Sequence, residues 1–226
     1  YNGYKVFATV RKDKDYEELA SLSINIKPIK MDVTDHDSIL EAKDEIKNHL
    51  EDKKLYSLIN NAGIAVAGPI ELISIEEIRR QFEVNYFGVI DTTQVFFDLL
   101  DKNSSKIINM SSVGGKTANP FMGPYNSSKF ALEAMSDSLR RELSGTNIDV
   151  IVIEPGMIIT PIWDKAEDID PVRYKDSIYY KPIENMKNFA ITNGRKGAPA
   201  ERVSDTILEV LSKKHNKARY WVSGNP

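Results

Sequence analysis

Cysteine is absent from this chain of 226 residues, which excludes disulfides and thiolate metal sites. Histidine is scarce. His36, His49 and His215 lie far apart among polar residues, and we expect all three to be ordinary surface residues and no metal site. No apolar run approaches the roughly 20 residues that cross a bilayer, so no membrane span is predicted. A chain without cysteine fits a reducing compartment, and we expect a cytoplasmic protein.

A strong charge of either sign is also lacking. The chain has 30 Lys and Arg against 33 Asp and Glu, a formal net charge of −3. Such a balance provides no general attraction to nucleic acid or to an anionic membrane, so neither is an expected partner. The length suffices for one sizeable domain, and the apolar content of 41% is ordinary for a globular protein.

Strand-like and helix-like segments alternate along the chain. Strands are expected where short runs are apolar or β-branched, at 5–10, 26–33, 55–60, 106–110, 148–153 and 219–222. Helices are expected where apolar residues recur every three or four positions, at 15–22, 34–50, 75–100, 125–143 and 203–211. This alternation favours a single α/β domain, a doubly wound, Rossmann-like parallel sheet with helices on both faces.

Local signals place several ends of these elements. Pro28 has no backbone N–H to donate, which suggests that its strand lies at a sheet edge. Thr34 with Asp37, and Ser74 with Glu77, are spaced as helix-capping pairs. The stretch 161–199 is rich in charged and aromatic residues, and we expect it to be irregular.

Tyr125 and Lys129 are four residues apart and share one face of an expected helix. A phenol has a pKa near 10, too high for easy proton exchange at neutral pH, and a nearby ammonium lowers it. The spacing therefore indicates an acid–base pair. A plain surface pair remains the alternative here, because many helices carry Tyr and Lys at this spacing by chance.

Small and polar residues follow three of the expected strands. Ser112 comes after the strand at 106–110, the run Asn60-Asn61-Ala62-Gly63 ends the strand at 55–60, and Pro155-Gly156 follows the strand at 148–153. The carboxyl ends of parallel strands share the edge where ligands of α/β folds bind. A hydroxyl there can donate to a carbonyl, and glycine lets the backbone approach a flat ligand closely. Tight turns are the simpler reading of each segment.

In this order and spacing, the segments resemble the short-chain dehydrogenase/reductase family. Within it, they look most like the retinol and hydroxysteroid branch. The likeness runs from Lys5 to about Thr160 and is weaker beyond. The residues that carry it are Asn60, Asn61, Ala62, Gly63, Asn85, Ser112, Tyr125, Lys129, Pro155, Gly156, Ile158 and Thr160.

The resemblance implies a role for each matching residue. It implies that Tyr125 exchanges the hydroxyl proton, that Ser112 orients the carbonyl or alcohol, and that Lys129 holds the nicotinamide ribose. Asn85 is implied to anchor a water in a proton relay, although it can also be a packing or helix-kink residue. The implied cofactor contacts are Asp32, Val33, Asn61, Ala62, Gly63, Tyr125, Lys129, Pro155, Gly156, Ile158 and Thr160.

One part of the family pattern is missing from this sequence. Dinucleotide-binding folds open with a strand, a Gly-rich turn that holds the pyrophosphate, and a helix. Tyr1 to Tyr4 look like the end of that helix, so the first strand and the Gly-rich turn are absent from the sequence. Losing a central strand would leave a gap of about 10 Å between its neighbours. We therefore expect about 30 further residues upstream in the natural protein; the alternative is that another segment fills the gap.

The end of the expected strand 5–10 bears on the choice of cofactor. Folds that prefer NAD place an acidic residue there for the ribose hydroxyls. Here Val10 is followed by Arg11 and Lys12. Arg11 can bind a 2′-phosphate through charge-assisted hydrogen bonds, so NADP is favoured over NAD. A solvated basic loop is the alternative.

The resemblance implies an NADP-dependent enzyme that transfers a hydride between the cofactor and a small-molecule carbonyl/alcohol pair. Residues 161–199 correspond to the substrate-covering segment, and their aromatic side chains suit a lipophilic substrate, although they can equally be core or dimer residues. The implied assembly is a homodimer or homotetramer formed by the helices that begin near Ile75 and Tyr125. A non-catalytic NADP-sensing protein on the same fold is the alternative function.

Overall fold

The computed structural model describes residues 3–160, 169–194 and 196–223. Its strands are β1 (Val6–Val10), β2 (Ile26–Lys30), β3 (Ser57–Asn60), β4 (Lys106–Met110), β5 (Asp149–Pro155) and β6 (Arg219–Val222). Its α-helices are α1 (Asp13–Leu22), α2 (His36–Leu50), α3 (Ile75–Phe82), α4 (Gly88–Phe96), α5 (Gly123–Glu142), α6 (Tyr180–Gly194) and α7 (Glu201–Ser212). The described residues thus confirm the alternating α/β pattern.

All strand pairings are parallel, but the described strands form two sheets. One has the order β1-β2 and the other β3-β4-β5-β6. No described strand pairs with the free edges of β1 and β3, so the alternative that another segment fills the gap does not hold for the described residues. A cavity of about 780 Å³ lies there, lined by residues of both strands, such as Phe7 and Leu58. The strand with Pro28 does lie at an edge.

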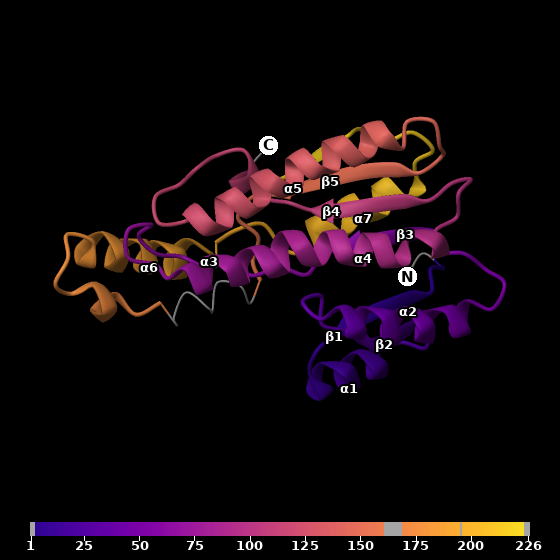
Figure 1. Ribbon diagram of the computed structural model, residues 1–226, viewed down its shortest axis with the longest axis horizontal. Coiled ribbons are helices and arrows are strands. Elements are labelled where there is room, and N and C mark those ends of the chain that lie inside the picture. Colours follow the sequence, from indigo (N-terminus) through magenta and orange to yellow (C-terminus); the bar gives the residue numbers. More distant parts are fainter. Residues whose placement is uncertain (1–2, 161–168, 195, 224–226) are drawn as a thin grey trace.

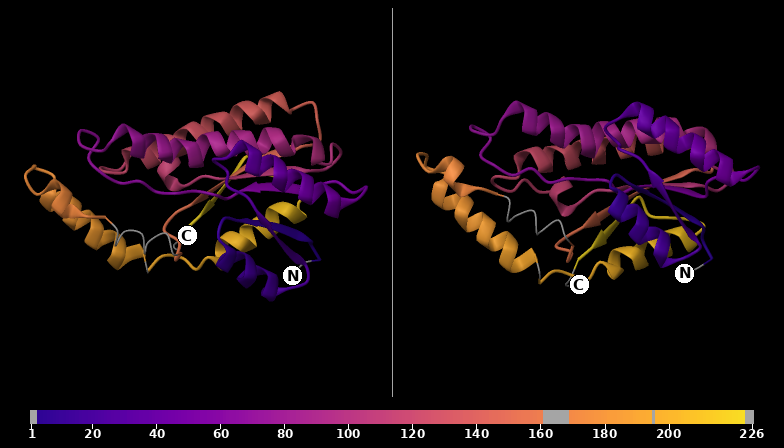
Figure 2. Two further views of the ribbon diagram at one scale, coloured as in Figure 1. Left: turned by 60° about the horizontal axis from the view of Figure 1, so that its bottom comes forward. Right: turned by 90° about the horizontal axis from the view of Figure 1, so that it is seen from below.

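Helices cover both faces of the four-stranded sheet (Figures 1 and 2). In these views α4 and α5 lie on one face, α7 lies on the other, and α6 extends away from the sheet at one end. The two-stranded sheet, with α1 and α2, lies beside β3. This is the Rossmann-like arrangement expected from the sequence, with its sheet divided.

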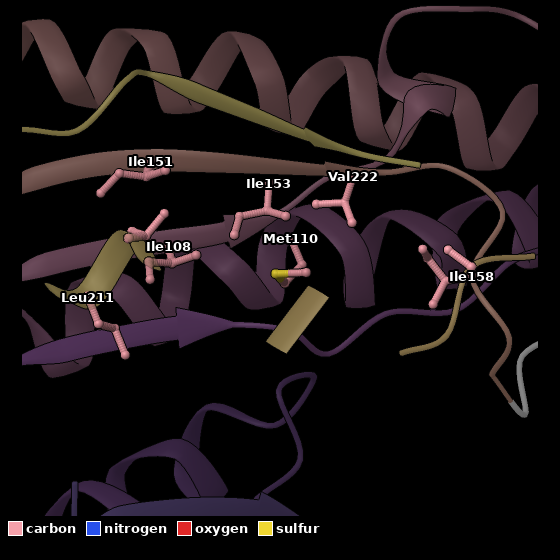
Figure 3. Packing of buried hydrophobic residues seen from close by; sticks show 9 residues of the cluster. Ile108, Met110, Ile151, Ile153, Ile158, Leu211 and Val222 are labelled. Atoms are coloured by element: carbon pink, nitrogen blue, oxygen red, sulfur yellow. The ribbon is translucent and has the colours of Figure 1, made fainter. Parts of the chain in front are cut away.

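One buried cluster of the four-stranded sheet lies on the face towards α7. Ile108 and Met110 of β4 pack with Ile151 and Ile153 of β5, and Leu211 of α7 closes the cluster (Figure 3). Every residue of β4 is buried, as are the five central residues of β5. Burying one such side chain contributes about 1.5–3 kcal/mol to stability. These strands therefore hold the loops at their carboxyl ends in place.

Three expectations about the helices need correction. The cap of α2 is Asp35, whose carboxylate accepts from the backbone N–H groups of Asp37 and Ser38, and not Thr34. Thr34 instead donates to Asp32. The expected helix 75–100 is divided by a π-helical segment, η1 (Glu83–Phe87). The stretch 161–199 is not irregular throughout, because α6 packs the fully buried Ile183. The capping box of Ser74 and Glu77 is confirmed.

Candidate active site

The carboxyl ends of β3, β4 and β5 meet at one edge of the sheet. Asn60 at the end of β3 is paired in register with Asn109 on β4, and Met110 is paired with Ile153 on β5. The Asn60 side-chain amide also donates to Asn109 Oδ1 at 2.8 Å. The Asn109 amide in turn donates to Ser136 Oγ of α5 at 2.9 Å. Buried hydrogen bonds therefore fix α5 to the strand ends.

Tyr125 and Lys129 lie on the first turns of α5. The Lys129 Nζ is 5.9 Å from the centroid of the Tyr125 ring. It is buried and donates to the Met110 carbonyl at 2.7 Å, which holds it at the end of β4. Gly114 comes so close to the Tyr125 ring that a Cβ there would lie 3.0 Å from Tyr125 Cε1. The turn after β4 therefore packs directly on the phenol.

Ser112 begins that turn, the short 3-10 segment η3 (Val113–Gly115). Its hydroxyl accepts from the Gly114 N–H at 3.0 Å and donates to the Pro155 carbonyl at 3.4 Å. It also lies near the Tyr125 phenol and lowers the pKa of that group. The structure thus brings the hydroxyl, the phenol and the ammonium of the three sequence-predicted residues to one place.

Burial sets the ionisation of both titratable groups. Burial raises the pKa of the Tyr125 phenol, and the neighbouring Ser112 hydroxyl opposes that rise. The net direction is opposite to the one predicted from Lys129 alone, because the phenol is largely enclosed. Burial also lowers the pKa of Lys129 to about 8, against the charge of Glu133. Tyr125 is therefore a protonated group at neutral pH, suited to donate a proton.

Asn85 is fully buried within the π segment η1. Its Oδ1 accepts from the Ile64 N–H at 2.9 Å, and its amide donates to the Ile64 carbonyl and to Ser128 Oγ. A π segment shifts the helix register and is frequent at functional sites. Here it directs Asn85 across the loop after β3, next to Gly63, where a Cβ would lie 3.5 Å from Asn85 Oδ1 and 3.8 Å from Lys129 Nζ.

The loop after β3 is open at this edge. Asn61, Ala62 and Gly63 are exposed, and Asn61 and Ala62 line the cavity beside β3 together with Val33. Val33 follows β2 and is partly buried. These residues offer backbone and small side chains to a flat ligand, as the sequence suggested.

Ser112, Tyr125 and Lys129 are together called the Tyr125 group. Two predicted cofactor residues lie apart from it, at the ends of the strands of the two-stranded sheet. Arg11 Nη1 is 3.6 Å from Asp32 Oδ2, with both side chains substantially exposed. Asp32 also accepts hydrogen bonds from the Thr34 N–H and hydroxyl. The pair is held in place at the end of β1 and β2, where Arg11 can exchange its carboxylate partner for a phosphate.

The segment after β5 has one buried and several accessible positions. The Gly156 N–H donates to the Val222 carbonyl at 2.7 Å, which continues the pairing with β6. Ile158 is buried in the core cluster and bridges to Ala198, so its side chain does not face the edge. Pro155 and Thr160 are partly exposed.

Three further residues shape the site without having been predicted. The fully buried Gln81 accepts from the Val66 N–H at 2.7 Å and donates to the Ile64 carbonyl, which clamps the loop after β3. Gln81 lies four residues before Asn85 and so shares its helix face, and this spacing is the sequence feature from which its role could have been predicted. Ser128 accepts from Asn85. Phe121 has a φ of 66°, a strained conformation for a non-glycine residue just ahead of Tyr125.

Two further features of the described residues concern membranes and metals. None of the described helices is both long and apolar enough to cross a membrane. Within the same residues, no group of three or more His, Cys, Asp or Glu side chains is placed to hold a metal ion.

Several known proteins are similar to this chain in sequence or in fold. The family model described as short chain dehydrogenase matches residues 1–170. An NADPH-dependent 3-dehydrocapnine reductase from Ornithobacterium rhinotracheale is 38% identical over 98% of this chain and 80% of its own length. A short chain dehydrogenase from Burkholderia cenocepacia, solved with NADP, is 26% identical, covers 96% of this chain and 76% of its own, and has a TM-score of 0.71. One from Burkholderia phymatum, solved with NAD, is 21% identical over 91% and 74%, with a TM-score of 0.75.

Proposed function

This chain belongs to the short-chain dehydrogenase/reductase family, and on that premise we propose that it transfers a hydride between NADP(H) and a carbonyl/alcohol pair. The observation that carries the proposal is the meeting of Ser112, Tyr125 and Lys129 at one sheet edge, where the serine hydroxyl lies near enough to lower the pKa of the phenol. Three polar groups of these types, from separate stretches of chain, suit proton transfer at a carbonyl oxygen.

The nicotinamide end of the cofactor has suitable residues. Gly63 has no side chain to fill the space beside Lys129 Nζ and Asn85 Oδ1, and the neighbouring backbone is exposed. We assign Asn61, Ala62, Gly63, Lys129 and the loop containing Pro155, Gly156, Ile158 and Thr160 to this end; Ile158 would act through the loop backbone.

We propose that the adenosine part of the cofactor binds at the two-stranded sheet. We assign the 2′-phosphate to Arg11 and the adenine to Asp32 and Val33. The support for NADP is the absence of an acidic residue directly after Val10, together with the NADPH dependence of the relative from Ornithobacterium rhinotracheale. NAD is the alternative, and a fold neighbour was solved with it.

Each residue of the Tyr125 group has a chemical task. When bound, the cofactor supplies or accepts the hydride. Tyr125, protonated at neutral pH because burial raises the pKa of its phenol, donates the proton to the carbonyl oxygen. Ser112 orients that oxygen through its hydroxyl, and Lys129 binds the ribose and provides positive charge. Asn85 holds the loop after β3 and is assigned the water of the relay.

Residues 161–199 are proposed to cover the substrate. The described part docks beside the site, because Arg173 forms a two-point ion pair with Glu77 and Tyr179 packs edge-on against Phe121 at 6.2 Å. Of the apolar and aromatic candidates, Tyr174 is buried and Phe189 is exposed, whereas Ile162 and Trp163 lie outside the described residues. The packed aromatic rings of Phe121 and Tyr179 favour a lipophilic substrate.

We also propose that residues 1–226 act as one NADP-binding domain within a homodimer or homotetramer in the cytoplasm. The apolar Phe87 and Phe130 are 51% and 44% exposed on the long helices, and exposed aromatic side chains favour contact with a second copy. Light scattering on the purified protein measures the assembly, and fractionation of the source cells tests the location.

The test is oxidation of NADPH with a panel of aldehydes and ketones of increasing apolar size. It uses the full-length protein as its gene encodes it, with Tyr125→Phe as the comparison. The proposal predicts turnover in the unaltered protein and loss of turnover in the variant, with cofactor binding retained. Equal rates in both would remove Tyr125 from the reaction. Tight NADPH binding without turnover on any substrate would favour an NADP sensor, which the presence of both Tyr125 and Lys129 argues against.

A further inference from the structure

A cluster of charged side chains with two buried carboxylates lies behind the group formed by Ser112, Tyr125 and Lys129. We call it the Glu133 cluster, and its members are Lys116, Glu133, Glu154 and Arg219. The side chains of Glu133 and Glu154 are 6% and 11% exposed. They come from α5 and β5, while Lys116 follows η3 and Arg219 opens β6. Four separate elements therefore meet around two enclosed carboxylates.

Glu133 is the centre of this cluster. Its Oε2 lies 3.1 Å from Lys116 Nζ and accepts from Arg219 Nε at 2.9 Å. Its Oε1 is buried without a hydrogen-bond partner among the described residues. The same two cations lie 3.5 and 3.3 Å from Glu154 Oε1. Leaving one oxygen of an enclosed carboxylate without a hydrogen-bond partner costs stability.

The cluster touches the parts that carry the proposed chemistry. Gly115, the last residue of η3, is packed so tightly that a Cβ would lie 3.1 Å from Glu133 Cγ and 3.3 Å from the Lys129 carbonyl oxygen. The turn that begins at Ser112 therefore rests on the Glu133 side chain. Lys116 directly follows η3, and Glu154 directly precedes Pro155, whose carbonyl oxygen accepts from Ser112.

Glu133 also acts on Lys129, one helical turn away. Burial lowers the pKa of Lys129, and the negative charge of Glu133 opposes that fall. The titratable groups facing Lys129 are Tyr125 and Glu133, both on α5. Those facing Glu133 from other elements are the remaining members of its cluster. Burial and the charge of Glu133 raise the pKa of Glu154, whereas Lys116 and Arg219 lower it.

We propose that Glu133 is a positioning residue of the active site, which keeps Lys129 charged and supports the turn that presents Ser112. The inference rests on the proposed function, since it assigns Glu133 a task within that reaction. The two cations of the cluster hold the Glu133 carboxylate in place and moderate its charge. A purely structural ion cluster would stabilise the fold without affecting the ionisation of Lys129.

The experiment titrates the Lys129 ammonium by NMR in protein labelled with ¹⁵N-lysine, and measures the pH profile of kcat in parallel. Glu133→Gln removes the charge and keeps the shape. It should lower the Lys129 pKa by about one unit and move the alkaline limb of kcat to lower pH by the same amount. Glu142→Gln, an exposed acid on the same helix, should move neither. Glu133→Asp restores the charge and should recover most of the shift.

A variant of opposite sign keeps the test decisive should Glu133→Gln fail to fold. Lys116→Gln removes a cation beside Glu133, so the Lys129 pKa should rise. An unchanged Lys129 pKa in either variant would overturn the inference. A shifted Lys129 pKa without any change in the kcat profile would leave Glu133 acting on Lys129 but remove Lys129 from the reaction, which is a failure of the proposed function.

Discussion

The two sheets of this protein divide the work unequally. In the four-stranded sheet β4 is wholly buried, and buried hydrogen bonds link Asn60 of β3 to Asn109 of β4 and Asn109 to Ser136 of α5. In the two-stranded sheet, β1 has no buried residue, and its candidate Arg11 is 59% exposed. Chemistry that depends on sub-ångström placement is assigned to the first region. Recognition of a phosphate, which a flexible cation can perform, is assigned to the second.

The largest expected effect lies in the four-stranded region. Tyr125→Phe removes the proposed proton donor but leaves the ring in its packing, so turnover should fall by about 10²–10⁴-fold. NADPH binding should remain within about twofold, since the hydroxyl is assigned to the substrate. Stopped-flow turnover and a fluorescence titration measure the two quantities. A variant that loses binding and turnover together would mean that Tyr125 only supports the structure.

Next in size is the difference in core packing. Ile151 of β5 is 1% exposed, and Ile151→Ala should reduce the free energy of unfolding by about 2–5 kcal/mol. Val6 of β1 is 44% exposed, so Val6→Ala should change it by no more than about 0.5 kcal/mol. Urea denaturation of both variants gives the comparison. Similar losses at the two positions would contradict the contrast between the sheets.

Cofactor selection tests the two-stranded region. Arg11→Ala removes the proposed partner of the 2′-phosphate and should weaken NADPH binding about 10–100-fold while leaving NADH binding nearly unchanged. Lys12→Ala, the adjacent basic residue, is the matched control and should have a smaller effect. Equal weakening for both cofactors would indicate that Arg11 does not read the 2′-phosphate.

The smallest effect concerns acid stability. Hydrogen bonding with Arg219 lowers the pKa of Asp137 on α5 to about 2. Because its folded pKa lies below the value of about 4 in unfolded chains, its contribution is present above pH 4 and is lost as the pH falls towards 2. Asp137→Asn should flatten that part of the stability curve. Asp13→Asn should not, since the ion pair of Asp13 with Lys30 near β1 is exposed. Equal curves for Asp137→Asn and the unaltered protein would contradict this.

Local signals predicted much of this fold. The residues 219–222 were expected as a strand and form β6, and Ser74 with Glu77 forms the expected capping box. Ser112, Tyr125 and Lys129 could be grouped because parallel strand ends must share an edge. These features depend on spacing within one element or on topology, both of which are visible in a sequence.

Other features depend on contacts between distant residues. Glu133 and Arg219 are 86 positions apart, and no local feature of either segment predicts their ion pair. Asn85 in the π segment donates to Ile64 and Ser128, which are 21 and 43 positions away in the sequence. The rise in the Tyr125 pKa follows from enclosure by the turn at Gly114, which a spacing argument cannot weigh.

The most direct test of the central claim is a double-mutant cycle on the rate of hydride transfer. It compares Ser112→Ala, Tyr125→Phe and the variant with both changes, in single-turnover reactions followed by NADPH absorbance. If the two hydroxyls act on one oxygen, the double variant should be hardly slower than the slower single variant. Losses that multiply as for independent residues would contradict a shared site.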